Sequence, residues 1–304
     1  MTATLDQPVK APTFHGVSAR RKLTNHVATV LVSLSVLIAV VPLVWVLVTV
    51  VVKGFGVVTS STWWFNSQSG MTAFTAGGGV YHAIVGTLLQ GLVCALISIP
   101  IGVFVGIYLV EYGGGTRLGK MTTFMVDILT GVPSIVAALF IYALWVATLG
   151  FERSGFAVSL ALVLLMIPVI VRSTEEMLRI VPMDLREASY ALGVPKWRTI
   201  TSIVIPTALS GIVTGILLAL ARVMGETAPL LILVGYAQAI NFDMSSGFMG
   251  SLPGMMYDQV SAGAGANPVP TDRLWGAAFT LIVLIALLNV GARFIAKFFS
   301  PKKV

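Results

Sequence analysis

Charged residues are scarce in this sequence. Of its 304 residues only 10% are Asp, Glu, Lys or Arg, whereas 57% are hydrophobic. Soluble domains contain about 25% charged residues, which keep their surfaces in contact with water. A chain with so little charge cannot cover a water-facing surface, which excludes an ordinary soluble protein. The composition predicts an integral membrane protein.

Cysteine and histidine are also rare, which bears on cofactors. The single cysteine, Cys94, excludes an internal disulfide and a cysteine-based metal cluster, and the three histidines show no metal-ligand spacing. Residues 114–120 resemble a phosphate-binding P-loop, but Met121 stands where that motif requires Ser or Thr. We therefore expect no metal, no cofactor and no enzymatic chemistry in this chain. If transport is driven by ATP, a partner ATPase is expected to bind the ATP and Mg²⁺.

Long apolar runs dominate the sequence instead. A spanning helix needs about 20 apolar residues, and continuous apolarity favours helices over the alternating strands of a β-barrel. The fold class predicted is an all-α polytopic membrane protein with six transmembrane helices. Prolines inside the runs are expected to kink their helices. The runs are residues 27–52, 83–110, 121–149, 155–171, 203–235 and 274–292, and the prolines are Pro42, Pro100, Pro133, Pro168 and Pro229.

Basic residues indicate the orientation of these helices. If the N-terminus is cytoplasmic, every Lys and Arg falls in an inner segment, apart from Arg222 within a run and Lys53, Arg153 and Arg273 in outer segments. Basic residues concentrate on the cytoplasmic side of membrane proteins. Both termini are therefore predicted to be cytoplasmic. Because the net charge of +7 gathers at the ends of apolar runs, the lipid bilayer is the expected partner, and no nucleic acid is.

The predicted spans divide the chain into successive parts. These are a cytoplasmic tail (1–26), a peripheral first helix (27–52), an outer loop (53–82), a core (83–292) with a cytoplasmic loop at 172–202, and a cytoplasmic tail (293–304). In the first outer loop, Trp63, Trp64 and Phe65 suit an aromatic belt at the membrane interface. A second outer loop, 236–272, is rich in Gly, Ser and Pro and shows no helical period.

The cytoplasmic loop carries a specific pattern. Its residues match EAA-x3-G-x9-I-x-L-P, with Ser189 in place of the third Ala and Ile205 in place of the Leu. Gly193 can adopt the left-handed conformation that ends a helix, and Pro195 can begin the next. Two short helices that meet at a sharp turn are predicted, with Trp197 exposed there for a partner to cover.

This pattern resembles the EAA loop of the permease subunits of ABC importers. The resemblance implies that residues 83–292 form a type I importer permease core. It also implies that the loop couples transport to a separate ATPase dimer. The residues that it assigns to ATPase coupling are Glu187, Ala188, Ser189, Gly193, Trp197 and Pro206.

Two charged residues, Arg222 and Glu226, lie deep in the fifth run. Four residues apart, they share one face if the helix is continuous. Charges inside a membrane are costly and usually line a pathway, although a self-neutralising structural pair is the alternative. The guanidinium fork of Arg222 matches the oxygens of phosphate, and Glu226 would orient Arg222 or discharge the site between turnovers. Gly225 and Pro229 could break the helix and expose backbone N–H groups to an anion.

The sequence from about residue 80 to the C-terminus is similar to a narrower family, the PstA-type permease subunits of phosphate-specific ABC importers (Pst systems). The runs ARVMGETAPLL and VRSTEEMLRIVPMDLREASYALG carry this resemblance. It implies that Arg172 and Arg222 lie on the phosphate pathway, with a cytoplasmic anchor as the alternative for Arg172. Glu175 and Glu176 are expected in the solvated loop, and Asp127 is given no role.

The predicted function is therefore the permease subunit of an ABC importer that carries inorganic phosphate through the cell (plasma or inner) membrane. The resemblance implies three partners: a second permease subunit in a heterodimer, an ATPase dimer and an extracytoplasmic phosphate-binding protein. An ABC permease for another oxyanion, such as sulfate or molybdate, is the first alternative. An ATP-independent secondary transporter has no reason to carry the EAA loop, and no inverted repeat is detected. A membrane scaffold or sensor leaves the Arg222 and Glu226 charges unexplained.

Overall fold

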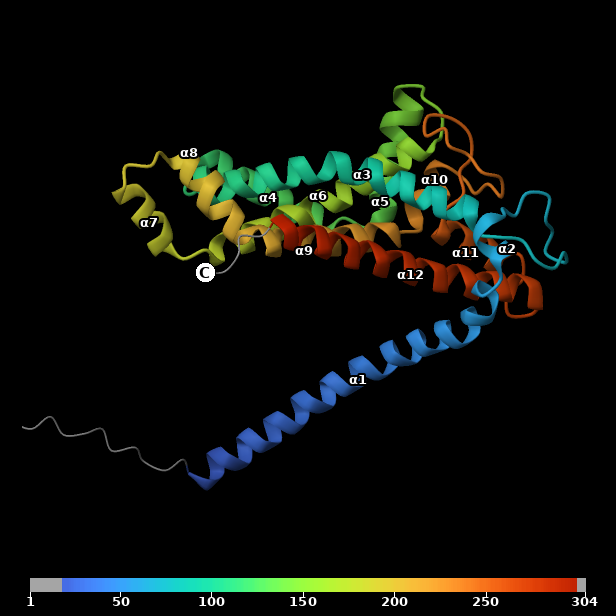
Figure 1. The fold of residues 1–304 in the computed structure, drawn as a ribbon, viewed down its shortest axis with the longest axis horizontal. Helices are drawn as coiled ribbons and strands as arrows, with labels where there is room; N and C mark the ends of the chain where they lie inside the picture. Colours follow the sequence, from blue (N-terminus) through green and yellow to red (C-terminus); the bar gives the residue numbers. More distant parts are fainter. Residues whose placement is uncertain (1–17, 300–304) are drawn as a thin grey trace, which may run out of the picture. The chain divides into compact units, whose positions relative to one another are not determined.

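The computed structural model describes residues 18–299, with side chains up to Phe294 (Figure 1). The outermost residues of the two predicted tails, 1–17 and 300–304, lie outside the described range. Within that range the regular structure is helical, and one isolated bridge between Ala264 and Asn267 is the only strand-like pairing. The prediction of an all-α protein is confirmed.

Five helical segments are long and apolar enough to cross a membrane, and a sixth is added if one bent pair of helices counts as a single span. Each of them covers one of the predicted apolar runs, which confirms the polytopic membrane architecture. The five segments are α1 (Ala19–Val58), α3 (Tyr81–Ile107) with a π-helical turn (Tyr108–Tyr112), α6 (Gly155–Ile180), α8 (Lys196–Thr199) continued through a π-helical turn (Ile200–Val204) into α9 (Ile205–Met224), and α12 (Pro268–Phe299).

The third predicted run, 121–149, forms the bent pair. Helix α4 (Arg117–Gly131) is followed by α5 (Ser134–Ile141) and a π-helical turn (Tyr142–Thr148), and the two parts are bent by 106°. The break lies at Val132 and Pro133, whose backbones are extended. Proline has no N–H to donate and pushes the residue before it out of the helical region. The sequence itself therefore stops α4 at this point.

The chain divides into two compact units, residues 1–49 and 50–304. In the first unit, α1 begins at Ala19, earlier than the predicted start at residue 27, and Pro42 lies inside the helix. In the second unit, the last turns of α1 run from Val50 to Val58. There Gly54 lies so close to α12 that an added Cβ would stand 2.7 Å from Phe279.

Helix α6 is the central element of the second unit, with α3 and α9 as its main neighbours (Figure 1). Both neighbours approach it through glycines four residues apart, Gly102 and Gly106 on α3 and Gly211 and Gly215 on α9. Small residues at this spacing let helix backbones come close. The two glycine pairs are thus packing devices that fix α6 on both sides. The side chains that they meet on α6 are Ile170, Ser173, Thr174 and Met177.

Three predicted boundaries are wrong. Helix α6 ends at Ile180, not at residue 171, because the polar residues after 171 pair with one another at helical spacing. The fifth run, 203–235, breaks after Met224, and a short helix, α10 (Ala228–Leu233), follows. The second outer loop contains α11 (Leu252–Ser261), whose start is capped by the Ser251 hydroxyl. In each case local pairing or capping, rather than apolarity, sets the boundary.

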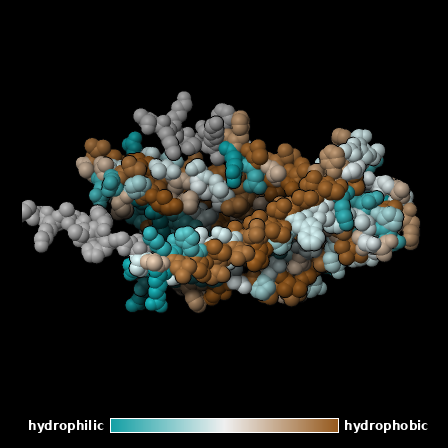
Figure 2. Space-filling model, turned by 90° about the horizontal axis from the view of Figure 1, so that it is seen from below, coloured by the Kyte–Doolittle hydropathy of each residue, from teal (hydrophilic) through white to brown (hydrophobic). Residues whose placement is uncertain are grey.

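The outer aromatic cluster lies mostly inside the protein. Trp63, in the short helix α2 (Ser61–Phe65), is buried, and its indole N–H donates to Thr280 Oγ1 at 3.0 Å. The Trp64 indole N–H donates to the carbonyl of Val58 at 2.8 Å, and only Phe65 is largely exposed. The prediction of an interfacial belt is therefore wrong for Trp63, which anchors α2 on α12. Figure 2 shows broad areas of apolar side chains at the surface, as a membrane protein requires.

Candidate functional site

The cytoplasmic loop forms the two short helices that its sequence predicts. Helix α7 (Met183–Ala191) is followed by Leu192 as its cap and by Gly193, whose φ of +76° is left-handed. Helix α8 begins after Pro195. The Gly193 N–H donates to the Tyr190 carbonyl at 2.9 Å, and the Val194 N–H donates to the Ser189 carbonyl at 3.2 Å. These two bonds satisfy the carbonyls at the end of α7. Gly193 is thus the elbow between the two helices.

A buried ion pair anchors this elbow to the end of α3. Arg186 of α7 pairs with Glu111 in the π-helical turn after α3, and it also donates to the Leu178 carbonyl at 2.9 Å. Both charged side chains are buried. Lys196 of α8 donates to the carbonyl of Glu111 and lies 4.8 Å from the ring centre of Tyr112. Glu111 therefore holds both helices of the elbow.

Sequence reasoning missed Glu111 and Arg186. Arg186 counted only as a basic residue on the cytoplasmic side, and Glu111 lies 75 positions away in the sequence. One signal was present in the sequence. Arg186 and Ser189 are three residues apart on α7, and this spacing puts both on one face, which the structure buries.

The residues predicted to couple to the ATPase divide into exposed and buried members. Glu187, Ala188, Gly193 and Trp197 are exposed, and Trp197 retains 63% of its accessible surface. Three further apolar residues of this segment, Met183, Tyr190 and Leu192, are also exposed. Such exposed apolar groups mark a surface that a partner covers.

The other two predicted coupling residues are less exposed. Ser189 is buried, and its hydroxyl is hydrogen-bonded to Thr199 Oγ1 of α8 at 2.8 Å. Pro206 lies in the first turn of α9, directly after the π-helical turn at residues 200–204. Proline has no backbone N–H to donate, and the first turn of a helix tolerates this. Ser189 thus joins the two helices of the elbow, and Pro206 lies where α9 begins.

Arg222 and Glu226 stand on either side of a helix break. Helix α9 ends at Met224, and Gly225 caps it, so the two side chains do not share one continuous helix face. They form no ion pair with each other, and the Arg222 side chain is exposed and has no hydrogen-bond partner among the described residues. The self-neutralising pair considered from the sequence is therefore wrong for this structure. Arg222 presents a free guanidinium within a spanning segment.

Two backbone N–H groups at the break are bonded within the chain. The N–H groups of Gly225 and Glu226 donate to the carbonyls of Arg222 and Val223, both at 3.2 Å. Glu226 lines a cavity of about 10 Å³ whose wall also contains the buried Gln90. The next two N–H groups, those of Thr227 and Ala228, make no backbone hydrogen bond among the described residues, so the expectation that the break exposes backbone N–H groups to an anion stays a prediction.

Arg172 lies inside α6 and is paired with two carboxylates. One terminal nitrogen contacts Asp127 of α4, and the other donates to Glu175 at 2.7 Å. Glu175 also accepts from Arg179 at 2.6 Å and is buried, so its placement in a solvated loop is wrong. Glu176 is exposed. The cluster of Asp127, Arg172, Glu175 and Arg179 joins α4 to α6.

The two arginines occupy different levels of the bundle. Ser173 packs against Gly215 of α9, so Arg172 lies near the level of that glycine. Arg222 follows Gly215 by seven residues, which at 1.5 Å per residue is about 10 Å along the helix. If the basic side of the protein is cytoplasmic, α9 runs outward from the elbow. Arg222 is then the outer cation and Arg172 the inner one.

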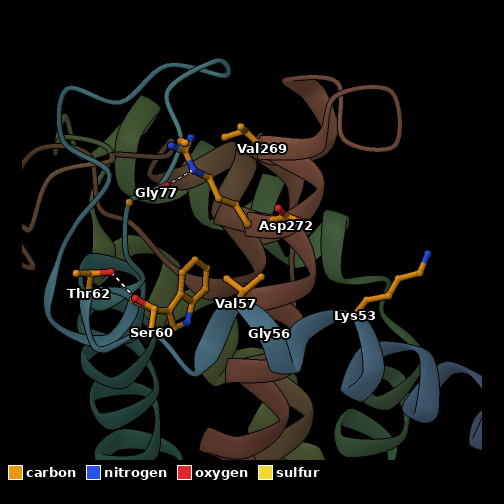
Figure 3. A pocket seen from close by; sticks show the side chains of 12 residues that line it. Lys53, Gly56, Val57, Ser60, Thr62, Gly77, Val269 and Asp272 are labelled. Carbon is orange, nitrogen blue, oxygen red and sulfur yellow. Dashed lines mark hydrogen bonds between the residues drawn. The ribbon is translucent and has the colours of Figure 1, made fainter.

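A cavity of about 430 Å³ opens at the outer end of the second unit (Figure 3). Arg273 lies in its wall and donates to the carbonyls of Gly77, Thr72 and Thr75 at 2.9, 3.1 and 2.7 Å. Asp272 adds a negative charge to the same wall. Arg273 is buried, and three of its nitrogens already donate to the carbonyls of the first outer loop.

A second set of bonds closes the outer end. The Tyr236 hydroxyl donates to Gln68 Oε1 at 3.0 Å and is hydrogen-bonded to His82 Nε2 at 2.8 Å. Burial raises the pKa of Tyr236 above its usual range, so the hydroxyl stays protonated and keeps donating. The outer loops are thereby fixed to the start of α3. The described residues contain no group of three or more metal-ligating side chains.

Comparison with known sequences identifies relatives. A family model described as "Binding-protein-dependent transport system inner membrane component" matches residues 98–304. The chain is 56% identical over 294 residues to the phosphate transport system permease protein PstA of Mycobacterium leprae (strain TN), covering 96% of this chain and 95% of that protein. It is 39% identical over 285 residues to the protein of the same name from Pasteurella multocida (strain Pm70), covering 93% and 96%.

Comparison with solved structures concerns the fold. The chain resembles a subunit of the MetNI methionine ABC transporter in inward-facing conformations, with a TM-score of 0.55 and 19% identity, covering 73% of this chain and 94% of that one. It also resembles a chain of a bacterial ABC transporter involved in the import of the acidic polysaccharide alginate, with a TM-score of 0.54 and 13% identity, covering 72% and 79%. Both likenesses confirm the type I importer permease fold.

Proposed function

Because this chain belongs to the family of binding-protein-dependent transport system inner membrane components, and within it to the PstA permeases, we propose that it carries inorganic phosphate through the membrane. In this proposal it is one permease subunit of an ATP-driven importer. The protein is a multi-pass membrane protein, and its relatives over nearly the whole chain are phosphate transport permeases. That likeness favours phosphate over sulfate or molybdate.

The observation that carries the proposal is the free guanidinium of Arg222. An arginine remains charged under all physiological conditions, and a charge in a spanning segment is costly unless a ligand, a partner or water compensates it. Among the described residues no carboxylate compensates Arg222. Its forked donors suit an oxyanion such as phosphate. Arg222 is therefore proposed as the outer phosphate contact.

In this proposal Glu226 is not a permanent ion-pair partner of Arg222. Because it lies beyond the helix break and lines a cavity with Gln90, it leaves Arg222 available to an anion. We assign to it the discharge of the site, in which its carboxylate competes for Arg222 after phosphate has left. Arg172, about 10 Å further inward along the helix axis, is the second contact on the pathway.

The coupling proposal assigns ATP hydrolysis to a separate ATPase dimer, which binds the ATP and Mg²⁺. The exposed elbow residues Glu187, Ala188, Gly193 and Trp197 are proposed to contact the ATPase, with Ser189 and Pro206 as their support. A second permease subunit completes the pathway, and an extracytoplasmic phosphate-binding protein delivers the substrate. The chain itself contributes the route and the mechanical contact.

Uptake of labelled phosphate into membrane vesicles that contain the complete complex tests this proposal. We expect uptake to require ATP on the cytoplasmic side of the membrane and the binding protein on the outer side. Uptake should continue in a large excess of sulfate or molybdate. Uptake without ATP would support a secondary transporter. Loss of phosphate uptake in the presence of sulfate or molybdate would support a permease for another oxyanion.

A further inference from the structure

Asp127 is a charged residue for which the proposed pathway has no role. It lies on α4, in the last turns before the bend at Pro133, and its carboxylate contacts Arg172 of α6. Arg172 uses its other terminal nitrogen for Glu175 at 2.7 Å. One guanidinium thus holds two carboxylates in this structure. Each carboxylate occupies donors that a phosphate oxygen would otherwise use.

The two carboxylates are held very differently. Glu175 is buried, belongs to the same helix as Arg172, and accepts a second ion pair from Arg179 at 2.6 Å. Asp127 comes from another helix, its side chain is 58% exposed, and it has no second partner among the described residues. Exposed ion pairs contribute little to stability and exchange readily. The contact with Asp127 is therefore the one that an arriving anion can displace.

We propose that Asp127 is an internal counter-anion, which occupies Arg172 between transport events and is displaced by phosphate during each event. The inference rests on the proposed function, since it takes Arg172 as a phosphate contact. Carboxylate and phosphate use the same guanidinium fork, so one edge of Arg172 serves only one of them at a time. Asp127 is a positioning residue that sets how tightly the inner site holds phosphate.

The exchange solves two physical problems at the inner site. Glu175 is shared between Arg172 and Arg179, so one carboxylate faces two positive charges in a spanning segment, and Asp127 supplies the second negative charge while no substrate is present. A site that held phosphate too tightly would not release it, and the return of Asp127 to Arg172 weakens the hold. Arg222, which has no such carboxylate in this structure, is by contrast free to accept phosphate first.

Equilibrium binding of labelled inorganic phosphate to the purified membrane complex, without the binding protein, tests the exchange. Asp127→Asn keeps the shape of the side chain and removes the competing charge. We expect Asp127→Asn to bind phosphate about 2- to 5-fold more tightly than wild type, which corresponds to about 0.4–1 kcal/mol for an exposed pair. Arg172→Gln should lose this binding component. Glu176→Gln is the control. It removes an exposed carboxylate from α6, the helix of Arg172, and this variant should bind phosphate like wild type.

Asp127→Ala is a second variant in case Asp127→Asn does not assemble, and co-purification of the subunits reports assembly. Unchanged phosphate binding in the Asp127 variants would overturn the inference while leaving the proposed function intact. Unchanged binding in Arg172→Gln would overturn the inference and the role of Arg172 as a phosphate contact, but not ATP-driven phosphate uptake. Failure of both Asp127 variants to assemble would make Asp127 a structural counter-ion and would also overturn it. By contrast, a wild-type complex without ATP-dependent phosphate uptake would refute the proposed function itself.

Discussion

The inner and outer halves of the second unit are held together by different chemistry. All four ion pairs among the described residues lie in the inner half, where they join α4, α6, α7 and the end of α3. The outer half uses buried hydrogen bonds, such as those of Trp63 with Thr280 and of Tyr236 with Gln68. Its buried cation, Arg273, donates to backbone carbonyls.

The difference separates contacts that can exchange partners from contacts that stay fixed. An ion pair can give up one partner to a competing anion, and a surface pair is screened by salt. A buried hydrogen bond between uncharged groups has no such competitor. The inner half is therefore suited to respond to phosphate and to an ATPase, while the outer half forms a fixed frame. The unpaired Arg222 lies between them.

Arg186→Ala should have the largest effect on stability, since it breaks the buried anchor of the elbow. It leaves Glu111 buried without its partner, and the loss of one member of a buried pair costs about 3–5 kcal/mol. We expect a lower unfolding midpoint of the solubilised complex and less co-purified ATPase. Arg198→Ala, at an exposed position of α8, is the matched control. Equal midpoints for the two variants would show that the ion pair does not anchor the elbow.

Gly193→Val should have an intermediate effect on ATPase binding, because it strains the backbone of the elbow. A left-handed conformation costs a residue with a Cβ about 1–2 kcal/mol, and a β-branched side chain is among the least tolerant. We expect the elbow to lose its sharp turn and the amount of ATPase that co-purifies to fall. Gly193→Asn is the control, because Asn tolerates this conformation. If both variants retain the ATPase equally well, the elbow geometry is not what the ATPase recognises.

Trp63→Phe should have a smaller effect, confined to the outer frame. The change keeps the aromatic ring in the core but removes the indole N–H that donates to Thr280, which is worth about 0.5–1.5 kcal/mol. We expect a modest fall in the unfolding midpoint with normal ATPase co-purification. A loss of ATPase binding in Trp63→Phe would mean that the two halves are not independent.

The smallest effect should be the loss of local stability in the second outer loop when Asp243 is protonated at low pH. Asp243 accepts hydrogen bonds from the Ser245 hydroxyl at 2.6 Å and the Ser246 hydroxyl at 2.7 Å, which lower its pKa from 3.8 to about 2. Because the folded-state pKa is depressed, the stabilisation is present above about pH 4 and is lost as the pH falls through about 2. Hydrogen exchange of residues 241–247 should therefore accelerate only at that acidity. Asp243→Asn should abolish this acid-dependent step.

Much of the fold could be predicted because its signals are local. The spacing from Glu187 to Pro206 predicts both short helices, and Pro133 and Gly225 each mark a break that the structure contains. The extension of α6 could not be read from apolarity, because Arg172, Glu175 and Arg179 pair on the helix surface. Local propensity and spacing therefore predict turns well, whereas polar helix ends depend on pairing.

The candidate site was harder to predict because its decisive contacts join distant parts of the chain. Asp127 and Arg172 are 45 positions apart, and Glu111 and Arg186 are 75 apart. Nothing in either local sequence reports such a contact. The alternative of a self-neutralising Arg222–Glu226 pair is wrong for the opposite reason. Their spacing implied one helix face, but the chain leaves the helix at Gly225, between the two residues.

ATP-dependent uptake of labelled phosphate by Arg222→Gln is the most direct test of the central claim. The variant removes the free cation and keeps a side chain of similar length, so we expect uptake to be abolished while the complex remains assembled. Arg117→Gln, at an exposed position at the start of α4, should transport like wild type. Normal uptake by an assembled Arg222→Gln complex would contradict the account.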